Sequence, residues 1–251
     1  MSARVAVLIA VPFAVLAFVL RLGGVLWWQP VTWRLGMVPG MLAFLGAFAA
    51  SIGIPLAAYL LATRAARRKP ATWQLDTTNR RFFAPVSPAS AGPRAILLGW
   101  IAGAAIPTER MPGHNAMRIA HLGVVTTIGT VVSALLLLAA MLILLLNRPS
   151  LSLDPCGLTL YRLVGRTSIP WTNLVPSGPR VPGERNPAAL KLLLRRPGEA
   201  PPQQHRLPVR ALHIDTAYLA TTIRHYTSDA SHRPSIGTVE ELAALKPNSG
   251  S

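Results

Sequence analysis

Apolar residues dominate three long stretches in the first part of the chain, with few polar positions to interrupt them. The stretches cover residues 5–28, 36–62 and 119–146. Each is at least as long as the roughly 20 apolar residues that an α-helix needs to cross a bilayer. The third is the clearest, because no charged residue occurs between positions 124 and 146. The pattern predicts three membrane-spanning helices.

A fourth apolar segment, residues 94–107, is shorter. Its centre, residues 95–106, reads AILLGWIAGAAI and would extend only about 18 Å as a helix, against a hydrocarbon core of about 30 Å. The preceding residues 83–93 are rich in Pro, Ser and Ala and are not expected to form a regular helix throughout. Three arrangements stay open: a tilted span that borrows flanking residues, a re-entrant hairpin, or an interfacial helix.

Small residues recur at three- and four-residue spacing along the second stretch, which allows helices to approach one another closely. We expect them to serve packing within the chain first and association between copies second. They are Gly36, Gly40, Ala43, Gly46, Ala47, Ala50 and Gly53. The fourth segment carries a similar pair, Gly99 and Gly103.

Beyond residue 147 the pattern changes to short runs in which apolar and polar residues alternate, separated by turns rich in Pro and Gly. Alternation with period two is typical of half-buried strands, and turns every 8–12 residues or so are typical of a small antiparallel sandwich or barrel. The predicted strands are residues 151–153, 158–163, 166–170, 189–196 and 205–209.

One helix closes this predicted β domain. Asp215 stands at the N-cap position, and Leu219, Ile223 and Tyr226 then recur on one helical face. Residues 238–241, Thr-Val-Glu-Glu, form a capping box that opens a last short helix. The sequence therefore predicts an α-helical membrane bundle of three or four spans over residues 1–147. A small β-barrel or sandwich capped by one α-helix follows over residues 148–246, and residues 247–251 form a disordered tail.

Charge sets the expected orientation. The chain carries a formal net charge of +16, and its basic residues gather between two apolar stretches rather than on a stripe interleaved with aromatics. This distribution disfavours a nucleic-acid partner and follows the positive-inside rule instead. We therefore expect residues 63–93 to be a basic cytoplasmic connector. The basic residues of this region are Arg64, Arg67, Arg68, Lys69, Arg80, Arg81 and Arg94.

The number of crossings decides where the tail lies. With three crossings and the basic connector inside, the tail is exported. With four, residues 94–107 cross the bilayer and the tail is cytoplasmic, which also suits a chain whose single cysteine forbids an internal disulfide. We favour four crossings, with the protein in the plasma membrane as a multi-pass protein.

Few residues invite a chemical role. Cys156 lies in a turn, and Arg21 lies near Trp27 and Trp28 of an aromatic belt, so we expect its side chain to reach toward the headgroups. His114 and His121 lack a carboxylate at ligand spacing. No catalytic motif occurs, and no acidic residue lies in the three long stretches. We therefore predict no catalytic, cofactor-binding or metal-binding residue and no cofactor.

In the tail a Gly-Leu second strand leads through a Gly turn to an Ile-Pro-Trp third strand. The residues of this pattern are Leu151, Leu153, Gly157, Leu158, Gly165, Ile169, Pro170, Trp171 and Leu174, followed by the closing segment 212–237. The pattern resembles the bacterial pleckstrin-homology (PH)-like domains found on actinobacterial membrane proteins, in which one helix closes the fold. The resemblance implies Trp171 as a core residue. The first hairpin offers only Arg162 and Arg166, so no inositol-lipid site is implied.

These features predict a non-enzymatic membrane protein that presents a cytoplasmic PH-like interaction module at the inner leaflet. The expected partners are the lipid bilayer and either another protein or a second copy of the chain, bound through the module or the small-residue helix faces. The alternative is a subunit of a transporter or channel, which would use the four embedded segments and Arg21.

Overall fold

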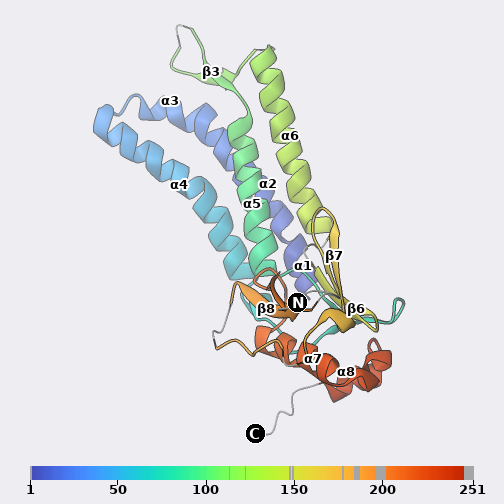
Figure 1. Ribbon diagram of the computed structural model, residues 1–251. Helices are drawn as coiled ribbons and strands as arrows, with labels where there is room; N and C mark the ends of the chain where they lie inside the picture. The colour runs from blue at the N-terminus through green and yellow to red at the C-terminus, as the bar shows by residue number, and fades with distance from the viewer. Residues whose placement is uncertain are drawn as a thin grey trace. The chain divides into compact units, whose positions relative to one another are not determined.

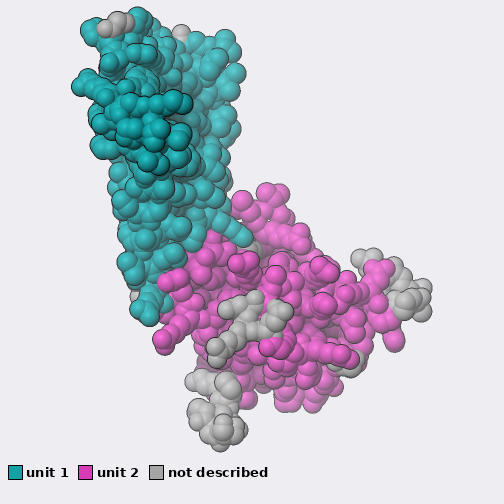
Figure 2. Space-filling view, turned by 90° about the vertical axis from the view of Figure 1, so that its left-hand side faces the viewer, with its two compact units in different colours: residues 1–64, 91–146 teal, residues 65–90, 147–251 magenta. Residues whose placement is uncertain are grey.

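The computed structural model divides the chain into two compact units, coloured separately in Figure 2. We call residues 1–64 and 91–146 the helical unit, and residues 65–90 and 147–251 the β unit. The β unit is thus built from two stretches separated in the chain. The structure describes residues 2–112, 114–121, 123–146, 148, 150–176, 178–183, 187–195 and 202–245.

Helices make up most of the helical unit, and its main helices α2, α4, α5 and α6 run in alternating directions (Figure 1). Three helical stretches, Ala3–Thr32, Met37–Ala62 and Val124–Leu145, are long and apolar enough to cross a membrane, as the sequence predicted. The first is continuous through four elements: α1 (Ala3–Leu8), α2 (Ala10–Gly23), the π-helix η1 (Gly24–Trp28) and α3 (Gln29–Thr32). The other two are α4 (Met37–Ala62) and α6 (Val124–Leu145).

The fourth segment is a longer helix than the sequence suggested. Helix α5 (Pro88–Ala105) has 18 residues and extends about 27 Å. It begins at Pro88, where the fixed φ of proline suits a first helical position, and it passes through Pro93. A proline so near the start removes a single helical hydrogen bond, so the Pro- and Ala-rich residues before Arg94 extend the helix instead of breaking it. Residues 83–93 are thus not a regular helix throughout, as predicted, but residues 88–93 form the start of α5.

Helix α5 packs tightly against its neighbours through glycines. A Cβ atom at Gly99 would meet the backbone of Ala14 on α2, and one at Gly92 would meet the Tyr59 ring on α4. By contrast, Gly46 and Gly53 of α4 face open space within the described residues. Close approach therefore occurs at the glycines of α5 and, in α4, at Gly40, where a Cβ atom would meet the carbonyl oxygen of Thr32 on α3, but not at Gly46 or Gly53.

A short hairpin joins α5 to α6. Its strands are β3 (Thr108–Arg110) and β4 (Met117–Ile119), which pair antiparallel. An ion pair between Arg118 Nε and Glu109 Oε1, 2.7 Å apart, spans them. Helix α6 begins at Val124 instead of residue 119, because residues 117–119 belong to this hairpin.

The β unit contains a five-stranded antiparallel sheet with the order β1-β2-β5-β6-β7. Its strands are β1 (Gln74–Asp76), β2 (Arg81–Ala84), β5 (Ser150–Asp154), β6 (Gly157–Tyr161) and β7 (Arg166–Pro170). A separate two-stranded sheet pairs β8 (Ala189–Leu194) with β9 (Gln203–Pro208). Isolated bridges join Val86 to Leu212 and Leu174 to Leu194. The described strands form no closed barrel, so that part of the prediction is wrong.

Residues 65–90 differ most from the sequence prediction, which treated residues 63–93 as a connector outside the β domain. They contribute the 3-10 helix η2 (Ala65–Arg67) and strands β1 and β2. Strand β2 pairs with β5, so that Phe82 lies opposite Leu153. The side chains of Trp73 and Phe82 are 3% and 0% exposed. Their apolar surface is buried only by strands beyond residue 147. The local sequence pattern of residues 73–84 therefore does not reveal that they belong to the β unit.

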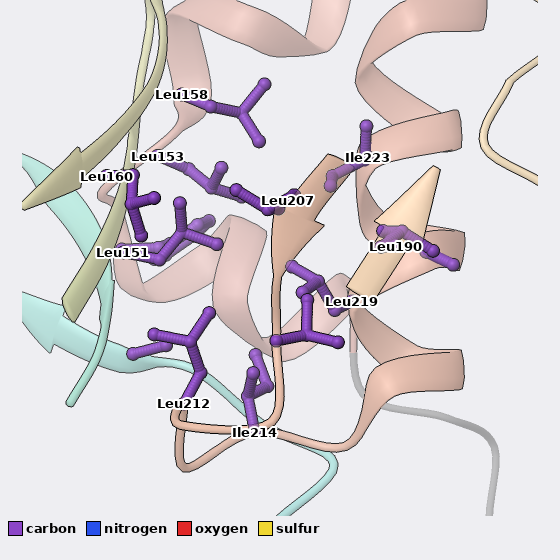
Figure 3. Close-up of a cluster of buried hydrophobic side chains, with 14 of the residues drawn as sticks. Leu151, Leu153, Leu158, Leu160, Leu190, Leu207, Leu212, Ile214, Leu219 and Ile223 are labelled. Atoms are coloured by element: carbon purple, nitrogen blue, oxygen red, sulfur yellow. The ribbon is translucent and has the colours of Figure 1, made fainter. Parts of the chain in front are cut away.

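Leucine and isoleucine side chains from both sheets and from helix α7 (Thr216–Ser228) form the core of the β unit. Figure 3 shows side chains of β5 and β6, such as Leu151 and Leu158, pointing toward Leu207 of β9 and Ile223 of α7. Trp171 of the 3-10 helix η3 (Trp171–Asn173) joins the same cluster. The predicted core face of α7 is confirmed, since Leu219, Ile223 and Tyr226 are fully buried.

Both predicted N-caps at the end of the chain are confirmed. The carboxylate of Asp215 accepts a hydrogen bond from Tyr218 N at the start of α7, and the hydroxyl of Thr238 accepts one from Glu241 N. The 3-10 helix η4 (Ala230–Ser235) and helix α8 (Val239–Ala244) follow α7. Helix α8 is the predicted last short helix, whereas the 3-10 helix η4 between α7 and α8 was not predicted.

Candidate functional site

A pocket of about 470 Å³ lies in the β unit, lined mainly by residues of α7 and α8. Tyr218, Thr222 and His225 of α7 line it, together with His232 of η4 and Glu241 of α8. These side chains all come from the C-terminal helical segment. The pocket therefore depends on how α7, η4 and α8 pack together.

Glu241 is the most buried acidic group of this pocket. The capping box fixes Glu241 in the first turn of α8, and Glu241 is only 7% exposed. The hydroxyl of the fully buried Tyr226 donates a hydrogen bond to Glu241 Oε1 at 3.0 Å. Within the described residues, the ion pairs of Glu241 are with histidines and none is with Lys or Arg. Burying a carboxylate costs free energy unless it is paired with a charge or coordinates a metal ion.

Two histidines approach the carboxylate of Glu241. His225 Nε2 lies 3.5 Å from Glu241 Oε1, and His232 Nδ1 lies 3.9 Å from Glu241 Oε2. The two imidazole rings are themselves close, with centroids 4.5 Å apart. One donor atom from each of the three residues lies within 4.8 Å of the others. Chemically, this set can form proton-dependent ion pairs or hold a divalent cation.

The surrounding groups hold definite protonation states. Burial, reinforced by the negative charge of Glu241, raises the pKa of Tyr226, so its hydroxyl remains a donor. Asp229 Oδ2 lies 3.6 Å from His232 Nε2. Hydrogen bonds from the hydroxyl and backbone of Ser231 lower the pKa of Asp229 and keep it anionic near neutral pH.

Cys156 and Trp171, both singled out in the sequence, lie elsewhere in the β unit. Cys156 is an exposed free thiol in the turn between β5 and β6. Trp171 is 2% exposed, and its indole N–H donates to Asp154 O at 2.9 Å, which agrees with the expected core role. Neither residue lines the pocket.

His114 and His121 belong to the helical unit and are both exposed. His121 Nδ1 lies 3.8 Å from Glu109 Oε1, a carboxylate that the sequence spacing did not assign to it. This pair is open to solvent, with the His121 side chain 75% exposed. Neither member of this pair is buried, whereas Glu241 of the β-unit cluster is.

Arg21 lies against aromatic side chains of neighbouring helices. Its guanidinium lies over the rings of Phe48 on α4 and Trp100 on α5, with Cζ 4.7 Å and 5.0 Å from the ring centroids. The Trp100 indole N–H donates to Ser51 Oγ at 2.8 Å, which fixes that ring. Cation–π attraction thus holds the charge between helices.

Sequence reasoning missed the cluster of His225, His232 and Glu241 because each residue had another explanation. The two histidines are separated by seven positions across a helix end, and Glu241 satisfied a capping box. The only available signal was that two histidines and three acids occur between residues 225 and 241 of a chain with nine acids.

Comparison of the chain with known protein families, with well-characterised proteins and with solved structures finds no significant match.

Proposed function

We propose that this protein crosses the membrane four times and holds its β unit in the cytoplasm as a non-enzymatic binding module. One observation carries the proposal. Strand β2 precedes α5 in the chain and strand β5 follows α6, yet the two strands are paired neighbours in one sheet.

This pairing constrains the number of crossings. Paired strands of an open sheet lie on one side of a bilayer, because unpaired edges are not tolerated in hydrocarbon. If α6 crosses once, the chain between β2 and β5 must cross once more to return. Helix α5 is the other α-helix described between these strands, and its length of about 27 Å nearly matches the hydrocarbon core. The pairing therefore favours four crossings over three.

The distribution of basic residues supports a cytoplasmic β unit. Seven basic residues lie between positions 63 and 94, where the chain leaves α4 and enters α5. The opposite ends of the helices carry only Arg34, Arg110 and Arg118. The positive-inside rule therefore orients the β unit toward the cytoplasm.

The shape of the β unit supports a binding role. A sheet followed by a C-terminal helix is the order found in PH-like domains, which the sequence of the tail resembles. Strands β1 and β7 form the edges of the five-stranded sheet, and a partner peptide can add to such an edge by backbone hydrogen bonding. The expected partner is another protein or a second copy of this chain.

A transport role is the second candidate, favoured by the position of Arg21 between α2, α4 and α5. A charge held inside a membrane bundle is often functional. No Asp or Glu occurs in the three long apolar stretches, which argues against a carboxylate ion pathway through the membrane. Ion flux through liposomes containing the purified protein would favour this alternative.

The topology is tested with a membrane-impermeant maleimide on cells that produce the full chain. Native Cys156 should react only after the cells are permeabilised. In a Cys156→Ser background, Thr77→Cys in the β1–β2 turn should behave like Cys156, and His114→Cys in the β3–β4 hairpin should react in intact cells. All three positions are exposed.

The three-crossing alternative gives a different labelling pattern. It places Thr77→Cys inside and Cys156 outside. Reaction of Cys156 in intact cells while Thr77→Cys stays protected would therefore overturn the proposal. Labelling of the detergent-solubilised protein at each position serves as the control for thiol reactivity.

A further inference from the structure

We infer that His225, His232 and Glu241 bind a zinc ion, with one coordination position left open to the adjoining pocket. The site lies wholly within the β unit, so this inference does not rest on the proposed topology or on a binding role for the sheet.

The distances between the histidine nitrogens and the Glu241 oxygens are close to those between ligand atoms around a bound zinc ion. Zinc bonds of 2.0–2.1 Å in a tetrahedral arrangement place neighbouring ligand atoms about 3.3–3.4 Å apart. His225 Nε2 is 3.5 Å from Glu241 Oε1, and His232 Nδ1 is 3.9 Å from Glu241 Oε2. Small side-chain rotations would bring one oxygen of Glu241 and both nitrogens onto a single ion.

The outer contacts match those of metal-binding histidines and carboxylates. A ligating histidine commonly donates its second ring N–H to a carboxylate, which fixes its tautomer. His232 presents Nδ1 to Glu241 and Nε2 to Asp229 Oδ2 at 3.6 Å. The Tyr226 hydroxyl holds the Glu241 carboxylate in place from the buried side.

One further observation points to a cation. Glu241 is buried without a Lys or Arg partner in the described part of the chain, so a metal ion would supply a positive charge beside it.

The ligand chemistry selects the class of metal. Two imidazoles and one carboxylate suit zinc and neighbouring first-row ions, whereas calcium and magnesium prefer sites made of oxygen alone. Three protein ligands beside a pocket leave room for an exchangeable fourth ligand.

The test measures zinc binding to the full chain in detergent, purified without a histidine tag. Isothermal titration with Zn²⁺ should give one site per chain, and Co²⁺ should give the visible absorption bands of a tetrahedral site. His225→Ala, His232→Ala and Glu241→Gln should each weaken Zn²⁺ binding roughly 100-fold or more. The Asp229→Asn variant, which alters only a positioning residue, should weaken it about 10–100-fold.

Controls separate loss of the site from loss of the fold. Glu241→Gln keeps an oxygen that can accept a hydrogen bond from Tyr226. The free energy of unfolding of this variant without metal should therefore stay close to that of the wild type. His121→Ala, at another histidine near a carboxylate, should leave Zn²⁺ binding unchanged. The inference is overturned if the wild type shows no saturable binding of one Zn²⁺, or if the folded Glu241→Gln variant binds as tightly as the wild type.

Discussion

Trp171 is one of the large buried side chains in the core of the β unit. Its ring is 2% exposed, packs 5.6 Å from the Tyr226 ring between centroids, and donates a hydrogen bond to Asp154 O. Trp171→Ala should lower the free energy of unfolding by about 3–5 kcal/mol, because it removes a large buried ring and leaves a carbonyl unpaired. Urea titration of the full protein in detergent measures the loss.

A matched substitution on the surface checks this prediction. Val164 is 87% exposed in the turn that precedes β7, so Val164→Ala should change the unfolding free energy by no more than about 0.5 kcal/mol. Equal effects of the two substitutions would mean that Trp171 does not belong to the core of the folded state.

Individual residues were predicted unevenly from the sequence. The caps at Asp215 and Thr238 were found because a cap needs only a polar side chain and the next few residues. The pairing of Glu241 with His225 and His232 was missed, since it arises only when η4 reverses the chain between α7 and α8. A local rule explains a side chain by its nearest neighbours in sequence. It accounts for Glu241 in the capping box but not for the contacts of Glu241 with the two histidines.

Among the elements, α5 shows how glycine sets the distance between helices. A Cβ atom at Gly99 would meet the backbone of Ala14, which has no flexible end to move aside. Gly99→Ala should therefore destabilise the helical unit by about 1–3 kcal/mol through forced separation of α5 from α2. The midpoint of thermal unfolding in detergent, followed by tryptophan fluorescence, measures this effect.

Gly46→Ala on α4 provides the matched control, since the same methyl group would enter open space there. Its midpoint should stay at or slightly above the wild-type value, because alanine favours helix more than glycine does. If Gly99→Ala also leaves the midpoint unchanged, α5 does not contact α2 through this glycine.

Elements with a strong local signal were predicted well, and those that depend on distant partners were not. The three long apolar helices follow from hydropathy alone, and strands β5 to β9 follow from alternation and turns. Strands β1 and β2 are three and four residues long and flanked by charge, so they carry no pattern of their own. Pairing with β5 gives them their structure.

At the scale of the whole molecule, the β unit is assembled from two parts of the chain. Gly237, at φ +86°, lies against the backbone of Arg80, so even the C-terminal segment packs onto residues 65–90. A fragment of residues 148–245 lacks the buried side chains of Trp73 and Phe82. Each is worth about 3–5 kcal/mol, a large share of the 5–15 kcal/mol or so that stabilises a typical domain.

We therefore expect that fragment to show no cooperative unfolding transition by circular dichroism. A soluble chimera that joins residues 65–90 to 147–251 through a flexible Gly/Ser linker should show one. The same chimera carrying Phe82→Asp should lose it, because a charge would then be buried in the sheet. A fragment of residues 148–245 as stable as the chimera would contradict this account of the β unit.

The interleaving of sheet and helices also fixes an order of events during translation. Strand β2 leaves the ribosome before α5 and α6 are made, and its partner β5 appears only after both. Until then residues 74–84 lack the partner strand that gives them their structure, and their unpaired backbone groups can pair wrongly with other chains. Residues 150–154 therefore complete a sheet whose first strands were made before two helices, and a nascent chain that stops after α6 leaves residues 74–84 without a partner.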